Sequence, residues 1–214
     1  MDCCRTVYIL AASSSTPTHR IQRRVYRADY ADQSWHTDMN LKLVDYGLFW
    51  TMCVDGYSRL VLWLEPVVDR RATTVWAPFA AVARVRGLPD QLVSDHGAEN
   101  RLMGLACWLF HVSLAPEERP ERAPHRGVSS VRNTRVERTW GEVNDKINRL
   151  IRCFGFFLEG SVGFDPSDSV QLGAFHRLVL PAMKYLGDMM MAARNSRRVQ
   201  ASRGNPGSGG QGLT

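Results

Sequence analysis

Apart from Thr37, apolar and polar residues alternate from Trp35 to Leu43. A period of two over this length is typical of a β-strand with one buried face. One face would carry Trp35, Thr37, Met39, Leu41 and Leu43, and the other His36, Asp38, Asn40 and Lys42. We therefore expect a strand whose polar face presents an aspartate.

Three further apolar runs predict the other strands. Residues 49–54 and 60–64 flank Asp55-Gly56-Tyr57-Ser58, a sequence typical of a turn, so they should form a hairpin. With the first strand they make a three-stranded meander. Residues 91–94 predict a short buried strand that ends at Asp95.

Apolar residues at helical spacing predict five helices, at 71–86, 100–110, 135–152, 170–180 and 183–194. Pro78 should kink or shorten the first helix, and Pro181 should separate the last two, because proline removes a backbone donor. The charged stretch 117–127, with Pro120 and Pro124, is expected to be a mobile loop. The alternation of strands and helices implies an α/β fold with a mixed sheet flanked by helices.

Length and composition favour one sizeable folded domain. The chain has 214 residues, of which 44% are hydrophobic, which is ample for a core. We expect a flexible leader at 1–22, a core with additional C-terminal helices at 23–195, and a disordered tail rich in glycine and serine at 196–214.

The cysteines indicate neither a disulfide framework nor a zinc module. There are five of them, at positions 3, 4, 53, 107 and 153, without CxxC spacing. A reducing, intracellular setting therefore fits best, nuclear if the organism is a eukaryote. The apolar stretch at 7–12 is too short to span a membrane, so no membrane partner is expected.

The charge points towards nucleic acid. The formal net charge is +6, and 24 of the 27 basic residues are arginine, whose planar fork suits bidentate contact with phosphate. Many lie towards the two ends, including Arg20, Arg23, Arg24 and Arg27, then Arg194, Arg197, Arg198 and Arg203. The alternative is that these arginines keep the chain soluble or reflect genomic composition.

Three acidic residues stand where strands or helices could direct them into one site. Asp38 lies in Trp-His-Thr-Asp, Asp95 in Ser-Asp-His-Gly, and Glu137 in Asn-Thr-Arg-Val-Glu-Arg. Each has an ordinary explanation: a solvent-facing strand residue, a turn residue, or a capping partner of Thr134. Their joint order instead favours divalent-metal chemistry on nucleic acid, because clustered carboxylates are tolerable only if a cation offsets their repulsion.

Four ordered motifs resemble the integrase catalytic core of retroelements and DDE transposases. They are the runs 35–43, 55–59, 94–100 and 133–140, and the similarity extends over about 23–195. The chain especially resembles eukaryotic integrase-core proteins. The resemblance implies a ribonuclease H-like five-stranded mixed sheet, with Asp38, Asp95 and Glu137 as catalytic residues and as ligands of two Mg²⁺ or Mn²⁺ ions.

The implied activity is polynucleotidyl transfer on DNA: nicking or end processing, followed by strand transfer. The resemblance also implies DNA as partner and a homo-oligomer. Asn133, Arg135 and Arg138 flank Glu137 and are candidates to hold DNA phosphates.

Two alternatives remain on the same scaffold. One is a domesticated, catalytically silent nucleic-acid-binding protein, favoured by the lack of a histidine and cysteine zinc module ahead of the core and by the arginine-rich flanks. The other is a protein-interaction module that uses the C-terminal helices as a dimer or partner surface.

Overall fold

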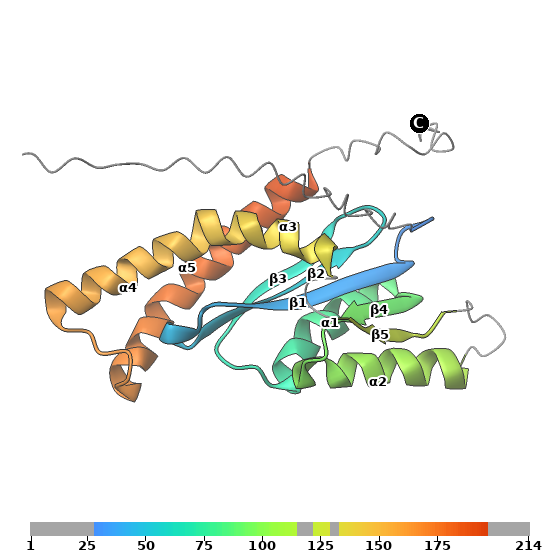
Figure 1. Ribbon diagram of the computed structural model, residues 1–214, viewed down its shortest axis with the longest axis horizontal. Coiled ribbons are helices and arrows are strands. Elements are labelled where there is room, and N and C mark those ends of the chain that lie inside the picture. Colours follow the sequence, from blue (N-terminus) through green and yellow to red (C-terminus); the bar gives the residue numbers. More distant parts are fainter. Residues whose placement is uncertain (1–27, 115–121, 129–132, 197–214) are drawn as a thin grey trace, which may run out of the picture.

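The computed structural model describes residues 28–114, 122–128 and 133–196 (Figure 1). The expected leader and the expected tail beyond Ser196 lie outside this range, as do residues 117–121 of the expected loop at 117–127. The last three residues of that stretch form a strand instead of a loop. Among the described residues, no helix is long and apolar enough to cross a membrane.

A mixed sheet of five strands forms the centre of the fold, in the order β3-β2-β1-β4-β5 (Figure 1). β1 is antiparallel to β2 and β2 to β3, whereas β4 is parallel to both β1 and β5. This is the ribonuclease H-like α/β fold that the resemblance implied. The strands are β1 (Ser34–Leu43), β2 (Leu48–Asp55), β3 (Val61–Val67), β4 (Gln91–Ser94) and β5 (His125–Gly127).

Helices cover both faces of the sheet. They are α1 (Ala72–Arg86), α2 (Arg101–Leu109), α3 (Thr134–Val143), α4 (Arg149–Val162) and α5 (Ser169–Asn195). Short 3-10 turns occupy Val44–Tyr46 and Ala98–Asn100, and π-helical turns occupy Phe110–Leu114 and Asn144–Asn148. The second π-helical turn joins α3 to α4, so one helical run extends from Thr134 to Val162.

The sheet separates two apolar cores. On one face, Trp35 and Leu92 pack with residues of α1 and α2, among them Phe79 and Met103. On the other face, residues of β2 and β3 pack with α3, α4 and α5. The expected helical layer at the C-terminal end is confirmed as the cover of this second face.

The predicted alternation along β1 is wrong beyond Asn40. The pairing of β1 with β2 shifts register between Asn40 and Leu43, as a β-bulge does. Because an extra residue reverses the inside and outside positions, Leu41 is exposed and Leu43 enters the core on the α3 side.

The prediction that Pro78 shortens its helix and that Pro181 separates two helices is wrong. α1 continues through Pro78 without shortening, and α5 is a single helix through Pro181. Pro181 and Arg177, whose carbonyl loses its donor, are both exposed, so water can satisfy that carbonyl. The helix predicted at 135–152 also extends ten residues further, to Val162.

Candidate active site

The strand register brings the two predicted aspartates to the same level of the sheet. β1 and β4 run parallel, with Trp35 beside Leu92 and His36 beside Val93. Continued by two residues, this register puts Asp38 beside Asp95, which directly follows β4. Sequence-distant carboxylates therefore meet because two parallel strands are neighbours.

The polar face of β1 is bonded to α3 and the turn after it, which lie against this face (Figure 1). His36 donates from Nδ1 to the Asn133 Oδ1 at 3.0 Å, and the Asn133 amide donates to the Thr37 carbonyl at 2.9 Å. The Trp140 indole donates to Asp38 Oδ2 at 2.9 Å.

One turn further along, Asn40 donates to Asn144 Oδ1 at 2.9 Å. We call the pairs His36–Asn133, Asp38–Trp140 and Asn40–Asn144 the polar ladder. Successive rungs follow the two-residue period of the strand and the helical spacing of its partner, so the ladder fixes how α3 lies on β1. Glu137, in the first turn of α3, is thereby held on the Asp38 side of the sheet.

Asp38 lies in an electrostatic environment that disfavours its charge. Burial, together with the negative charges of Asp95 and Glu137, raises the pKa of its carboxyl to about 6, although hydrogen bonds from Trp140 and the Met39 amide oppose the rise. Both other acidic residues are thus close enough to Asp38 to act on its ionisation. Glu137 is exposed, whereas Asp95 is half-buried.

Neutral donors hold Asp95 in place. Its Oδ1 accepts from the Asn100 amide at 2.7 Å and from the Gly97 backbone N–H at 3.1 Å. Asn100 precedes α2 but forms no side-chain cap there. Its side chain instead orients the Asp95 carboxylate.

The donor chemistry of the site fits a hard divalent cation. Among the described residues, no arginine or lysine forms an ion pair with Asp38, Asp95 or Glu137. The rise in the Asp38 pKa, caused first by burial and then by the two neighbouring acids, is therefore opposed by hydrogen bonds but by no cationic side chain among the described residues. Carboxylate oxygens are the ligands that Mg²⁺ prefers. As they stand, however, no three acidic, histidine or cysteine side chains in the described part of the chain gather as a metal-binding group.

The three candidates for phosphate contact occupy different environments. Asn133 is fully buried and both groups of its amide bond to β1, so its described contacts position the strand. Arg135 is half-buried and Arg138 is exposed. Arg194, one of the flanking arginines, is bonded to Glu142 at 2.6 Å and ties the end of α5 to α3.

Three of the described histidines have structural bonds of their own. Burial lowers the pKa of His36 to about 4, so this ring is neutral near pH 7 and donates to Asn133. His125 Nε2 contacts the Ser94 hydroxyl at 3.0 Å, and His111 Nε2 donates to the Pro89 carbonyl at 2.7 Å. The sequence did not single out Trp140 as a partner of Asp38, because an indole in a helix reads as a core residue.

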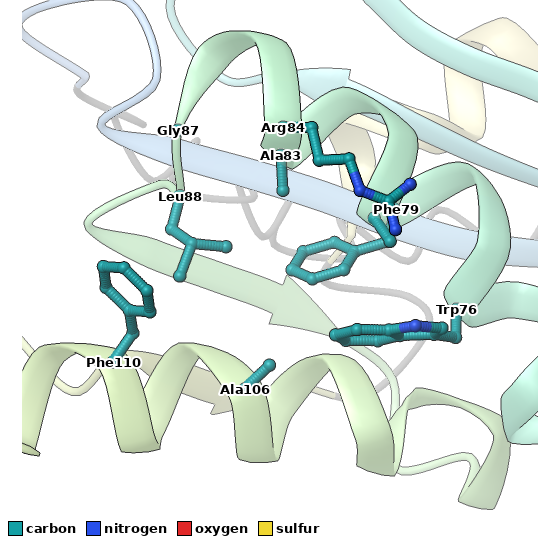
Figure 2. Close-up of a pocket in the computed structure, with 9 residues that line it drawn as sticks. Trp76, Phe79, Ala83, Arg84, Gly87, Leu88, Ala106 and Phe110 are labelled. Atoms are coloured by element: carbon teal, nitrogen blue, oxygen red, sulfur yellow. The ribbon is translucent and has the colours of Figure 1, made fainter.

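A cavity of about 310 Å³ lies between α1 and α2, on the face of the sheet opposite α3. Figure 2 shows its lining, with Trp76 and Phe79 near one end and Leu88 and Phe110 near the other. Among the described residues that line the cavity, Arg84 is the only charged one and none carries a carboxylate. The cavity is therefore separate from the acidic site.

Comparison with known proteins places the chain among integrase cores. A family model described as integrase core domain matches residues 25–206. Among solved structures, the HTLV-2 integrase catalytic core domain, in complex with magnesium and in trimeric form, matches with 15% identity and a TM-score of 0.40. The match covers 70% of this chain and 85% of that chain. No curated protein matches the chain.

Proposed function

The chain belongs to the integrase core domain family, and on this basis we propose that it is a divalent-metal-dependent polynucleotidyl transferase that acts on DNA. In this proposal Asp38, Asp95 and Glu137 are the metal ligands. The observation that carries it is the raised pKa of Asp38, a carboxyl that is partly buried, lies near two other acids and has no basic partner among the described residues. A carboxylate with a purely structural role would not be stabilised by burial near two other acids.

When bound, two Mg²⁺ or Mn²⁺ ions would supply activation of a water or a DNA 3′-hydroxyl and stabilisation of the leaving oxygen. The residues of the chain would hold these ions and orient the carboxylates that bind them. Trp140 fixes one Asp38 oxygen, and Asn100 with the Gly97 N–H fixes one Asp95 oxygen. The exposed Glu137 is free to turn towards the two aspartates.

Phosphate binding is assigned to the flank of the same helix. Arg135 and Arg138 lie on either side of Glu137 in α3, so a DNA strand that reaches the carboxylates passes these guanidinium groups. Action on DNA fits an intracellular protein, nuclear in a eukaryote.

The test is nicking of supercoiled plasmid DNA in Mn²⁺, compared between the wild type and Asp38→Asn. We expect the variant to lose roughly a thousandfold in rate, because several kcal/mol of transition-state stabilisation depend on the ions. Asp45→Asn, a change of an exposed aspartate just after β1, is the matched control and should retain the wild-type rate. Equal nicking by the wild type and Asp38→Asn would refute the proposed site.

A catalytically silent module is the second candidate, and a specific observation favours it. The three acidic side chains are not gathered as a metal group in the described part of the chain. If this candidate holds, the wild-type protein binds DNA with a strong salt dependence but does not nick it. The Asp38→Asn variant then binds DNA with the same affinity as the wild type.

A further inference from the structure

Glu99 is a buried acid directly beside the candidate site. It lies in the 3-10 turn Ala98–Asn100, which follows Asp95 closely in the chain, and only 5% of it is exposed. Burial of a charged group is costly unless the group is paired. Gly97 and Asn100, which hold Asp95, lie on either side of Glu99 in the chain. Glu99 is therefore inside the turn that orients Asp95.

The partner of Glu99 is Arg70. The Arg70 guanidinium donates to Glu99 Oε1 at 3.3 Å, and the arginine side chain is 48% exposed. Among the described residues, no other cationic side chain forms an ion pair with Glu99. This ion pair joins the loop that follows β3 to the turn that follows β4.

The loop that carries Arg70 is itself fixed. Asp69 Oδ1 accepts from the Thr74 hydroxyl at 2.6 Å and from the Arg71 N–H at 3.0 Å. These two bonds lower the pKa of Asp69 and tie the loop to the first turn of α1. Because the loop is already ordered, Arg70 reaches Glu99 at a lower cost in conformational entropy.

Glu99 packs directly against Gly97. A Cβ atom on Gly97 would lie 2.6 Å from the Glu99 Cδ and from both carboxylate oxygens, closer than van der Waals contact allows. The backbone of Gly97 is extended, with φ −62° and ψ 142°, so its conformation does not require glycine. Glycine is needed here for the space that the Glu99 carboxylate occupies.

We propose that Glu99, neutralised by Arg70, is a positioning residue that holds the Asp95 carboxylate for metal binding. The inference rests on the proposed function, because it assigns a role at the same site. Arg70 pairs with Glu99, and Glu99 packs against Gly97. The Gly97 N–H in turn donates to Asp95 Oδ1 at 3.1 Å, which leaves Oδ2 for an ion. Residues behind a metal ligand set its orientation and its affinity.

The first readout is hydrogen exchange of the Gly97 amide, followed by NMR in the metal-free protein. Arg70→Ala and Glu99→Ala should each accelerate this exchange about tenfold, because the turn loses the contact that fixes it. The matched control is Arg86→Ala, which removes the ion pair of Arg86 with Asp32 at the other end of α1. It should leave the Gly97 exchange rate unaltered. Urea denaturation verifies that each variant is folded.

The second readout is the affinity for Mn²⁺, measured by calorimetry. Arg70→Ala should raise the dissociation constant about tenfold, since it leaves the Glu99 charge buried without a partner. Glu99→Gln alone should bind Mn²⁺ nearly as the wild type does. Adding Glu99→Gln to Arg70→Ala should recover most of the lost affinity, because a neutral amide of the same shape needs no cation. Arg86→Ala should retain the wild-type affinity.

Two results would overturn the inference. One is a Gly97 exchange rate that does not change in Arg70→Ala and Glu99→Ala. The other is a loss of Mn²⁺ binding in Glu99→Gln as large as in Asp95→Asn, which would make Glu99 a ligand instead of a positioning residue. A wild type that binds no Mn²⁺ refutes the proposed function, whereas the exchange rates still decide whether Arg70 and Glu99 hold Asp95.

Discussion

On one face of β1, Trp35 packs edge-to-face against Trp63 and Phe79, with ring centroids 6.5 and 6.1 Å away. On the other face, His36 and Asp38 are fixed by hydrogen bonds to Asn133 and Trp140. The first face is stabilised by non-directional burial, and the second by bonds that each require a particular atom.

The difference separates the contacts that stabilise this strand from the bonds that position Asp38. The aromatic face holds the strand in the sheet. The polar face costs stability, because it keeps a partly buried carboxyl beside two other acids. The hydrogen bonds of this face, which form the polar ladder, fix where Asp38 lies relative to α3 and Glu137.

The comparison predicts its largest effect for Trp35→Ala. Removing a fully buried indole should lower the free energy of unfolding by about 3–5 kcal/mol, since a cavity replaces the ring. Urea denaturation measures this loss, and Leu41→Ala, at an exposed position of the same strand, should change little. A loss below about 1 kcal/mol for Trp35→Ala would contradict burial as the basis of this face.

Asn133→Ala should have the next largest effect on the free energy of unfolding. It leaves the buried Thr37 carbonyl and the His36 ring without the bonds that Asn133 supplies, which should cost about 2–3 kcal/mol in urea denaturation. Affinity for Mn²⁺ should fall as well, because α3 is less firmly placed. For Asn144→Ala, whose rung lies farther along the chain from Glu137 than Asn133 does, we expect a stability loss with metal affinity retained. Metal affinity unchanged in Asn133→Ala would show that the ladder does not position the site.

Asp38→Asn should stabilise the metal-free protein. The folded-state pKa of about 6 lies above the ordinary 3.8, so the folded state binds more protons between these values. Wild-type stability contributed by this group is therefore present at low pH and is lost as pH rises from about 4 to 6. Above pH 7 the variant should be more stable by about 1–3 kcal/mol.

The measurement is the difference between the two denaturation curves across pH 4–8. His36 affects stability with the opposite sign over a similar pH window, because its pKa, lowered to about 4, makes stability rise with pH. Both proteins contain His36, so its contribution cancels in the difference and that of Asp38 remains. Asp45→Asn should follow the wild type. A constant difference across this range would mean that the Asp38 pKa is not raised.

Trp140→Phe should have the smallest effect on stability, about 1 kcal/mol, since it keeps the ring and loses one hydrogen bond. Because that bond lowers the Asp38 pKa, the same carboxyl should titrate at a higher pH in the variant. Trp63→Phe is the matched change on the other face, where the indole bonds to Thr51 Oγ1 at 3.2 Å, and it should leave Asp38 unaffected. NMR titration of the Asp38 carboxyl compares the two.

How much the sequence predicts also differs between the two faces. Burial leaves a period of two in the residues themselves, so the strand and its apolar face from Trp35 to Met39 were predictable. The bulge after Asn40 was not, because it depends on how β1 pairs with β2. Likewise β5, with three residues in a charged stretch, was not located, since it forms only as the neighbour of β4.

The site shows the same limit. The motifs indicated Asp38, Asp95 and Glu137, and the fold brings Asp95 and Glu137 near Asp38. The residues that hold them were not all indicated. His36 and Asn133 are 97 positions apart, and Trp140 is apolar enough to be assigned to the core, so only the packing of α3 on β1 reveals these bonds.

The central claim is that the polar face of β1 is part of a metal site, and calorimetric titration of the purified protein with Mn²⁺ tests it without knowledge of the DNA substrate. We predict binding by the wild type and by Asp45→Asn, and its loss in both Asp38→Asn and Asp95→Asn. A folded wild type that binds no Mn²⁺ with or without added DNA, or binding that survives both substitutions, would contradict the claim.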